Sequence, residues 1–286
     1  MFATSTARLH VAATIEEAAA ALADAGSDGA ALAGGTWIMR APIRGESAAG
    51  LYVALTRIPE LQRIDVQDHE IVIGAAATHT RIAAALDSHP DCAGLVKAVL
   101  KGANPAVRHM ATLGGNLNST RFAASDIIPA LLCLDAEVEL RSTAGRERLP
   151  LPTFLDRRAT LPAGTLLTQV RFARRAARYA HVRLPLRKAG DYPVAIVSAS
   201  AQVASDGRVR DLRLAVGSVE QVARRWHDLE GLARGQPLDG DAIGGAAERH
   251  CTDFRGRDGV EAEGWYRTQV LPTLVRRAVH SLLQSH

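Results

Sequence analysis

The chain has 286 residues, of which 47% are hydrophobic and 22% charged. This length favours two domains, and this balance is typical of a globular protein rather than a disordered one. The formal net charge of +4 is too small for a typical nucleic-acid-binding protein, so we expect no nucleic acid partner. Three widely spaced cysteines form neither a disulfide framework nor a zinc motif. We therefore expect a reducing compartment.

The first residues show no basic stretch followed by an apolar stretch, so we expect no secretory signal. An alanine-rich stretch at residues 18–23 is too short to cross a membrane, and acidic residues flank it. These features predict a soluble protein of the cytoplasm with no membrane insertion.

The first half of the chain alternates between helical and strand patterns. Thr14, followed by Glu17, predicts a capping box for a helix that ends at Gly26. Further helices are expected over residues 78–86, 93–102 and 127–134. Strands are expected over residues 30–33, 51–55, 136–141, 148–151 and 166–172, with a hairpin in residues 62–77. Prolines and Gly164 predict a loop region over residues 150–164.

A run of basic residues without acidic neighbours follows, formed by Arg171, Arg174, Arg175, Arg178, Arg183, Arg187 and Lys188. We place a domain boundary near residue 175. The run is either a solvated face or a docking face for an acidic partner. Beyond it, Ser205-Asp206-Gly207 joins two long strands over residues 193–203 and 209–216. Helices are expected over residues 222–234, 241–255 and 265–283.

Two segments, residues 32–39 and 104–117, each carry a Gly-Gly pair close to a threonine. Glycine lets backbone N–H groups approach a ligand, and successive N–H groups bind anions. Two such loops facing each other could hold the two phosphates of a dinucleotide, with hydroxyl donors from Thr36 and Thr112. Asn116 and Asp126 could reach a ribose. Neither segment has the G-x-G-x-x-G or P-loop pattern, which disfavours a Rossmann site and an NTPase.

The chain resembles the FAD-binding medium subunit of the molybdenum hydroxylases, the family of xanthine dehydrogenase and CO dehydrogenase. Residues 33–38 read Ala-Gly-Gly-Thr-Trp-Ile, similar to the first flavin loop of the family. Residues 104–116 read Asn-Pro-Ala-Val-Arg-His-Met-Ala-Thr-Leu-Gly-Gly-Asn, similar to its second signature. Residues 124–138 and 188–197 also resemble family segments, in the same order along the chain.

The resemblance implies an α+β fold in which two small subdomains, divided near residue 60, hold FAD. This FAD-binding domain would cover residues 1–175, and a C-terminal domain of antiparallel sheet and helices would cover residues 176–286. The implied FAD contacts in the first loop are Leu32, Ala33, Gly34, Gly35, Thr36, Trp37 and Ile38. Those in the second loop are Thr112, Gly115, Asn116, Ser119 and Thr120, and those elsewhere are Ala103, Asp126, Leu166 and Arg183.

Several of these assignments have a structural alternative. Leu166 could be a core leucine, Arg183 a solvated member of the basic run, and Asp126 a helix N-cap that also binds the ribose. Trp37 stands where relatives carry a small or acidic residue, and Arg183 stands where they carry lysine. The three cysteines are expected to behave as small buried apolar residues.

The resemblance further implies an electron-transfer subunit without catalytic residues for an organic substrate and without a metal site of its own. A small partner subunit would carry [2Fe–2S] clusters, and a large one would carry the molybdopterin cofactor, as a dimer of heterotrimers. Two other functions are open from the residues alone. One is a self-contained flavin oxidoreductase with its own substrate site, and the other is a non-catalytic nucleotide-binding or assembly module.

Overall fold

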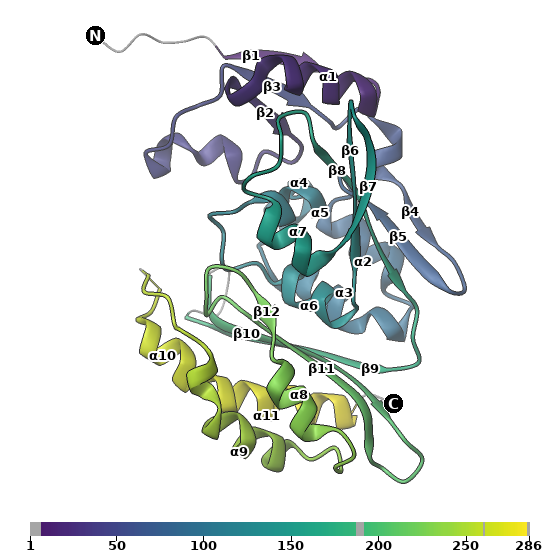
Figure 1. Ribbon diagram of the computed structural model, residues 1–286, viewed down its shortest axis with the longest axis vertical. Coiled ribbons are helices and arrows are strands. Elements are labelled where there is room, and N and C mark those ends of the chain that lie inside the picture. Colours follow the sequence, from purple (N-terminus) through teal and green to yellow (C-terminus); the bar gives the residue numbers. More distant parts are fainter. Residues whose placement is uncertain (1–6, 187–191, 260, 285–286) are drawn as a thin grey trace. The chain divides into compact units, whose positions relative to one another are not determined.

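The structure, a computed structural model, describes residues 7–186, 192–259 and 261–284 (Figure 1). It divides into two compact units that interleave along the chain. Unit 1 takes Met1–Ile82, Pro105–Thr120 and Glu137–Phe172, and unit 2 takes Ala83–Asn104, Arg121–Ala136 and Ala173–His286. The two units are described separately below.

A small parallel sheet begins unit 1, with the strand order β1-β3-β2. Its strands are β1 (Arg8–Val11), β2 (Gly29–Leu32) and β3 (Leu51–Ala54). Helix α1 (Ile15–Ala25) connects β1 to β2. Thr14 caps it as predicted, since its Oγ1 accepts from the Glu17 N–H at 3.1 Å. The helix ends at Gly26, whose φ of 55° is left-handed backbone that glycine tolerates.

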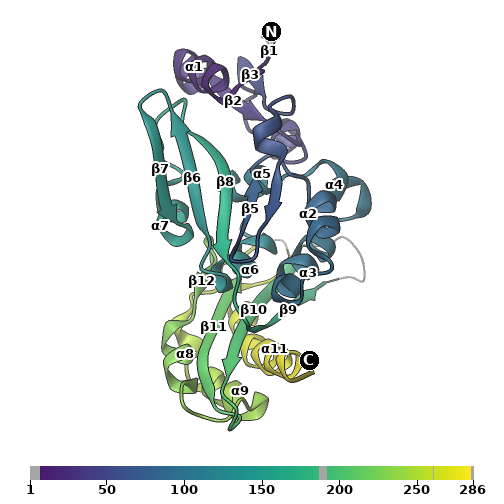
Figure 2. The same cartoon turned by 90° about the vertical axis from the view of Figure 1, so that its right-hand side faces the viewer.

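A five-stranded sheet completes unit 1, with the order β4-β5-β8-β6-β7 (Figure 2). Its strands are β4 (Ile64–Val66), β5 (Glu70–Gly74), β6 (Glu137–Ser142), β7 (Gly145–Pro150) and β8 (Leu166–Ala173). Helix α2 (His79–Leu86) follows β5. The predicted loop over residues 150–164 is wrong in part, because α7 (Leu151–Arg157) begins there. Pro150 and Pro152 lie at its N-terminus, where a helix needs no N–H donor.

Unit 2 is built on an antiparallel sheet with the order β12-β11-β10-β9. Its strands are β9 (Arg178–Pro185), β10 (Pro193–Val203), β11 (Val209–Gly217) and β12 (Arg224–Arg225). The hairpin predicted around Ser205-Asp206-Gly207 is confirmed by the pairing of β10 with β11. Strand β9 was not predicted, because its buried residues Tyr179, Ala180 and His181 follow one another without alternation and arginines stand near them.

Helices cover both faces of this sheet (Figure 1). Helices α3 (Ala93–Lys101) and α6 (Ile127–Cys133) contact one face, and α8 (His227–Ala233), α9 (Gly240–Arg249) and α11 (Leu271–Gln284) enclose a large core on the other. The helix predicted over residues 265–283 is divided in two, because α10 (Gly264–Gln269) ends at Val270, two residues before Pro272. The helix predicted from residue 222 begins at His227, after β12.

In the described part of the basic run, most arginines have a carboxylate partner, whereas Arg178 donates to the Leu282 oxygen. Four of its arginines form ion pairs, so these four match neither the solvated face nor an uncompensated docking face. The pairs are Arg171–Glu70 at 3.0 Å, Arg174–Asp91 at 2.8 Å, Arg175–Asp211 at 3.0 Å and Arg183–Asp126 at 3.1 Å. Arg187 and Lys188 lie outside the described residues.

Across the described ranges, no helix combines the length and the apolar character that a bilayer crossing requires. The three cysteines are free thiols. Cys92 and Cys133 are buried as expected, whereas Cys251 is only partly buried. Burial raises the pKa of the Cys92 thiol to about 12 and the pKa of the Cys133 thiol well above its usual range.

These environments predict unequal thiol reactivity. At pH 8 a thiol with a pKa near 12 is about one part in ten thousand thiolate, so Cys92 and Cys133 should resist modification. We expect a chromogenic disulfide reagent to modify one thiol per native chain, Cys251, and all three in denaturant. A Cys251→Ser variant should show no rapid reaction when native. Equal rates for two native thiols would contradict this arrangement.

Candidate functional site

The two glycine-containing segments lie against each other in unit 1. A Cβ atom built on Gly34 would lie 1.9 Å from the carbonyl oxygen of Met110 and 3.1 Å from the Ala111 Cα. Such distances are far inside van der Waals contact, so Gly34 meets the second segment backbone to backbone. No other residue fits at position 34 without separating the two segments.

The first segment leaves consecutive backbone donors available. It follows β2 directly, and Gly35 turns the chain with a φ of 71°. Among the described residues, the N–H groups of Ala33, Gly34, Gly35 and Thr36 donate to no acceptor. Leu32 to Ile38 are all half-buried. Half-buried donors in succession make an anion-binding concavity, which we name the N–H cradle of residues 33–36.

The second segment is helical, although its glycines predicted a loop. It forms α4 (Pro105–Met110) and α5 (Leu113–Asn118), with Thr112 as the N-cap of α5. The Gly114 N–H donates to the Ala75 oxygen at 2.7 Å, and the Gly115 N–H donates to the Thr112 Oγ1 at 3.2 Å. The expected second run of free N–H groups is therefore absent here. Gly114 instead serves packing, because an added Cβ would lie 2.8 Å from the Ala75 Cβ.

The second segment presents polar side chains to a ligand, whereas the first presents backbone N–H groups. The Thr112 hydroxyl accepts from Gly115, so its own proton can still be donated. The Ser119 hydroxyl donates to the Gly115 oxygen at 2.7 Å, while Asn116 and Thr120 are half-buried. Arg158, which is buried, donates to the Leu117 oxygen and so holds the end of α5. Burial lowers the pKa of Arg158.

Leu166 begins β8 and is 3% exposed. It packs in the core of unit 1 with residues of α1, which agrees with the core alternative for this leucine. A contact between Leu166 and FAD stays a prediction.

The other three predicted contacts lie in unit 2. Asp126 is 2% exposed and occupies the N-cap position of α6, as the N-cap alternative predicts, but its side chain makes no capping hydrogen bond. Ser125 makes this bond instead, since its Oγ accepts from the Ile128 N–H at 3.2 Å. The Asp126 carboxylate turns to Arg183, whose Nε lies 3.1 Å from Oδ1. Ala103 is half-buried at the end of α3.

Two further residues, His181 and Ser198, lie beside Asp126, although the sequence analysis did not single them out. The Nε2 atom of His181 lies 3.1 Å from Asp126 Oδ1, and its Nδ1 atom lies 2.9 Å from the Ser198 Oγ. Both side chains are 1% exposed, and they come from paired positions of β9 and β10. Among the described residues, Asp126 Oδ2 accepts no hydrogen bond. Alternation in β9 does not signal this cluster, because Tyr179, Ala180 and His181 are all buried; the pairing of β9 with β10 brings His181 and Ser198 together.

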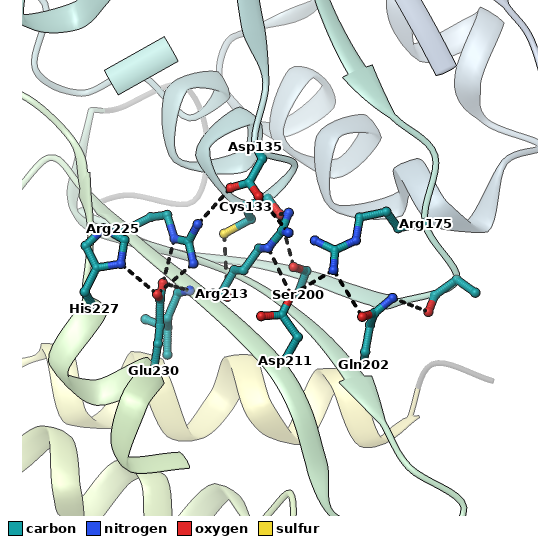
Figure 3. Close-up of polar contacts among 12 residues, drawn as sticks. Cys133, Asp135, Arg175, Ser200, Gln202, Asp211, Arg213, Arg225, His227 and Glu230 are labelled. Atoms are coloured by element: carbon teal, nitrogen blue, oxygen red, sulfur yellow. Dashed lines mark hydrogen bonds and ion pairs between the residues drawn. The ribbon is translucent and has the colours of Figure 1, made fainter. Parts of the chain in front are cut away.

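A larger polar network in unit 2 holds the chain together and is not a ligand site (Figure 3). Asp135, at the end of α6, binds Arg213 at 2.7 Å and Arg225 at 2.8 Å. Arg225 also pairs with Glu230, which accepts from the Leu214 N–H at 2.8 Å. Each arginine therefore has a carboxylate partner, which leaves no net charge for a ligand. No group of three or more His, Cys, Asp or Glu within the described part of the chain could hold a metal ion.

Comparison with known protein families shows which family the chain belongs to. The family model described as the FAD binding domain in molybdopterin dehydrogenase matches residues 4–173. The chain belongs to this family. The model of the CO dehydrogenase flavoprotein C-terminal domain matches residues 179–282. The family resemblance and the α+β fold class are thereby confirmed, and the chain is a flavoprotein of a molybdopterin-dependent oxidoreductase, with FAD as its cofactor.

Individual relatives agree along the whole chain. The 6-hydroxypseudooxynicotine dehydrogenase complex subunit alpha of Paenarthrobacter nicotinovorans is 26% identical, over 96% of this chain and 93% of its own. The carbon monoxide dehydrogenase medium chain of Hydrogenophaga pseudoflava is 24% identical, over 95% of both chains. The solved structure of reconstituted CO dehydrogenase from Oligotropha carboxidovorans shares the fold with a TM-score of 0.90 and 23% identity, over 98% of this chain and 99% of that chain.

The contact at Gly34 gives a direct test of the site. A Gly34→Ala substitution should push the two segments apart, at a cost of about 1–3 kcal/mol in the free energy of unfolding, and the FAD content per chain should fall. Flavin absorbance after denaturation measures the FAD content, and thermal unfolding measures stability. Gly231→Ala is the matched control, because a Cβ there meets no atom within 4 Å. Full FAD content in Gly34→Ala would contradict the packing.

Proposed function

We propose that this chain is the FAD-carrying electron-transfer subunit of a multi-subunit molybdenum dehydrogenase. The observation that carries the proposal is the N–H cradle of residues 33–36, whose donors have no acceptor among the described residues. A diphosphate supplies such acceptors, and the site is half-buried, so water competes less for these donors than it would on an exposed surface. When bound, FAD supplies reversible oxidation and reduction.

The chain's own residues then have distinct roles in this proposal. Backbone groups of Leu32, Ala33, Gly34, Gly35, Thr36, Trp37 and Ile38 hold the diphosphate. Hydroxyl and amide groups of Thr112, Asn116, Ser119 and Thr120 bind the neighbouring part of FAD, and Gly115 leaves room beside them. Ala103, Asp126, Leu166 and Arg183 are proposed contacts from other parts of the chain. No side chain of this chain is proposed to act on an organic substrate.

The partner subunits follow from the same proposal. A small subunit with [2Fe–2S] clusters would deliver electrons to the FAD of this chain, which would pass them to an external acceptor. A large subunit with molybdopterin would oxidise the organic substrate. The names of the relatives, a medium chain and a subunit of a dehydrogenase complex, support a multi-subunit assembly. We further propose a dimer of heterotrimers in the cytoplasm.

The domain division is also part of the proposal. An FAD-binding domain of residues 1–175, with subdomains divided near residue 60, would precede a C-terminal domain of residues 176–286. The two family-model matches, which end at residue 173 and begin at residue 179, support a boundary between them.

Purification in the native state tests the proposal. We expect this chain to contain FAD and to co-purify with a chain that holds iron–sulfur clusters and a chain that holds molybdenum. In the intact complex, an organic substrate should reduce the flavin. In the isolated chain, the same substrate should leave the flavin oxidised, because the substrate site lies on another chain. Absorbance spectra, metal analysis and mass spectrometry give these results.

Two outcomes would contradict the proposal. Flavin reduction by the organic substrate in the isolated chain would favour a self-contained flavin oxidoreductase. A colourless native chain that releases no flavin would favour a nucleotide-binding or assembly module.

A further inference from the structure

The segment after the N–H cradle folds back onto it. It forms two short 3₁₀ helices, η2 (Ile38–Arg40) and η3 (Pro42–Arg44), and Trp37 is the N-cap of the first. The guanidinium carbon of Arg44 lies 4.1 Å from the centre of the Trp37 ring. The Arg44 Nη1 also donates to the Trp37 carbonyl oxygen at 2.9 Å. One arginine thus contacts both the ring and the backbone of the residue that follows the cradle.

Glu46 fixes this arginine from the other side. The Arg44 Nε donates to Glu46 Oε1 at 3.0 Å, and the Arg44 Nη2 donates to Glu46 Oε2 at 2.7 Å. The side chains of Arg44 and Glu46 are 24% and 22% exposed, respectively. Gly45, with a φ of 70°, makes the turn that lets both side chains meet. The carboxylate neutralises the guanidinium, so Arg44 is suited to fasten the segment rather than to bind a phosphate.

We propose that Trp37, Arg44 and Glu46 form a clamp that holds the N–H cradle in its binding conformation before FAD arrives. The proposal rests on the proposed function and adds positioning residues to it. A segment with two glycines loses much conformational entropy when it is ordered, and donors without acceptors do not hold it. The clamp supplies contacts that hold the end of the cradle in the absence of ligand. Preorganisation of this kind raises affinity for the ligand, here one with a diphosphate group.

The type of side chain at position 37 matters for this contact. A small or acidic residue at this position would give Arg44 no ring face to stack on, whereas Trp offers the strongest one. The Trp37 ring is then one attachment point for Arg44, and the Trp37 carbonyl is the second.

Glu46→Gln in the full-length chain separates this mechanism from simple electrostatics. The variant removes a negative charge near an anion site, so charge alone predicts tighter binding of FAD and ADP. The clamp predicts the opposite, because Arg44 loses its carboxylate. We expect the dissociation constants of FAD and ADP to rise about tenfold, through loss of cation–π and charge-assisted contacts. Fluorescence titration of FAD and calorimetric titration of ADP give these constants.

Further variants define the contacts. Trp37→Phe keeps a ring face and should retain most of the affinity, whereas Trp37→Ala should lose about as much as Glu46→Gln. Arg44→Lys keeps the charge but not the planar fork, and should weaken binding. Arg40→Ala is the matched control, because it removes an exposed arginine of η2 whose side chain makes no hydrogen bond or ion pair among the described residues. Its affinity should stay within twofold of the unaltered chain.

Hydrogen exchange in the cofactor-free chain provides a readout that does not depend on binding. The Ala41, Arg44 and Glu46 N–H groups donate to oxygens within residues 38–41, so they should exchange faster in Glu46→Gln and not in Arg40→Ala. Unchanged exchange together with equal or tighter binding in Glu46→Gln would overturn the clamp while leaving FAD binding intact. Failure of the unaltered chain to bind FAD and ADP would instead overturn the proposed function, and the clamp's role with it.

Discussion

One backbone contact makes the site possible. Gly34 lies so close to the Met110 carbonyl that the two signature segments are joined without any side chain between them. Because Gly34 is fixed there, the donors of residues 33–36 keep one orientation and find no acceptor within the described chain. Half-buried donors in succession that meet no protein acceptor form an anion-binding concavity, so the contact and the unused donors together point to a ligand. The helical second segment is the rigid partner that this contact requires.

The glycine pairs of the two signature segments look alike in the sequence but have different roles in the structure. In the first segment glycine frees backbone donors, whereas in the second Gly114 allows close packing on Ala75 and its N–H is consumed. The same dipeptide therefore serves binding in one place and packing in the other. In the second segment Thr112 caps α5 and takes up the Gly115 N–H, while the Ala75 oxygen takes up the Gly114 N–H.

Local signals in the sequence predicted local structure well. Thr14 with Glu17, and the turn at residues 205–207, each act within a few residues, and the structure has the helix and hairpin that they imply. The prediction failed where distant partners decide. Arg183 of β9 suggested a surface, although Asp126, which is distant in the sequence, neutralises it. The prolines at the start of α7 suggested a loop for a local reason, since a proline also suits the first turn of a helix. The motifs indicated the cradle, but the positions of Arg44 and His181 beside the predicted residues required the folded chain.

The strand order of the larger sheet in unit 1 has a consequence for folding. β8 is its middle strand, yet it is the last to be synthesised. The β4–β5 and β6–β7 hairpins can each close locally, but until residue 166 is made each presents an unpaired edge. Joining them needs contacts between residues far apart in sequence, which form slowly. During synthesis the chain therefore exposes, for a time, two hairpins whose unpaired edges can pair with other chains. The eight-residue strand β8 then pairs with both hairpins and covers both edges.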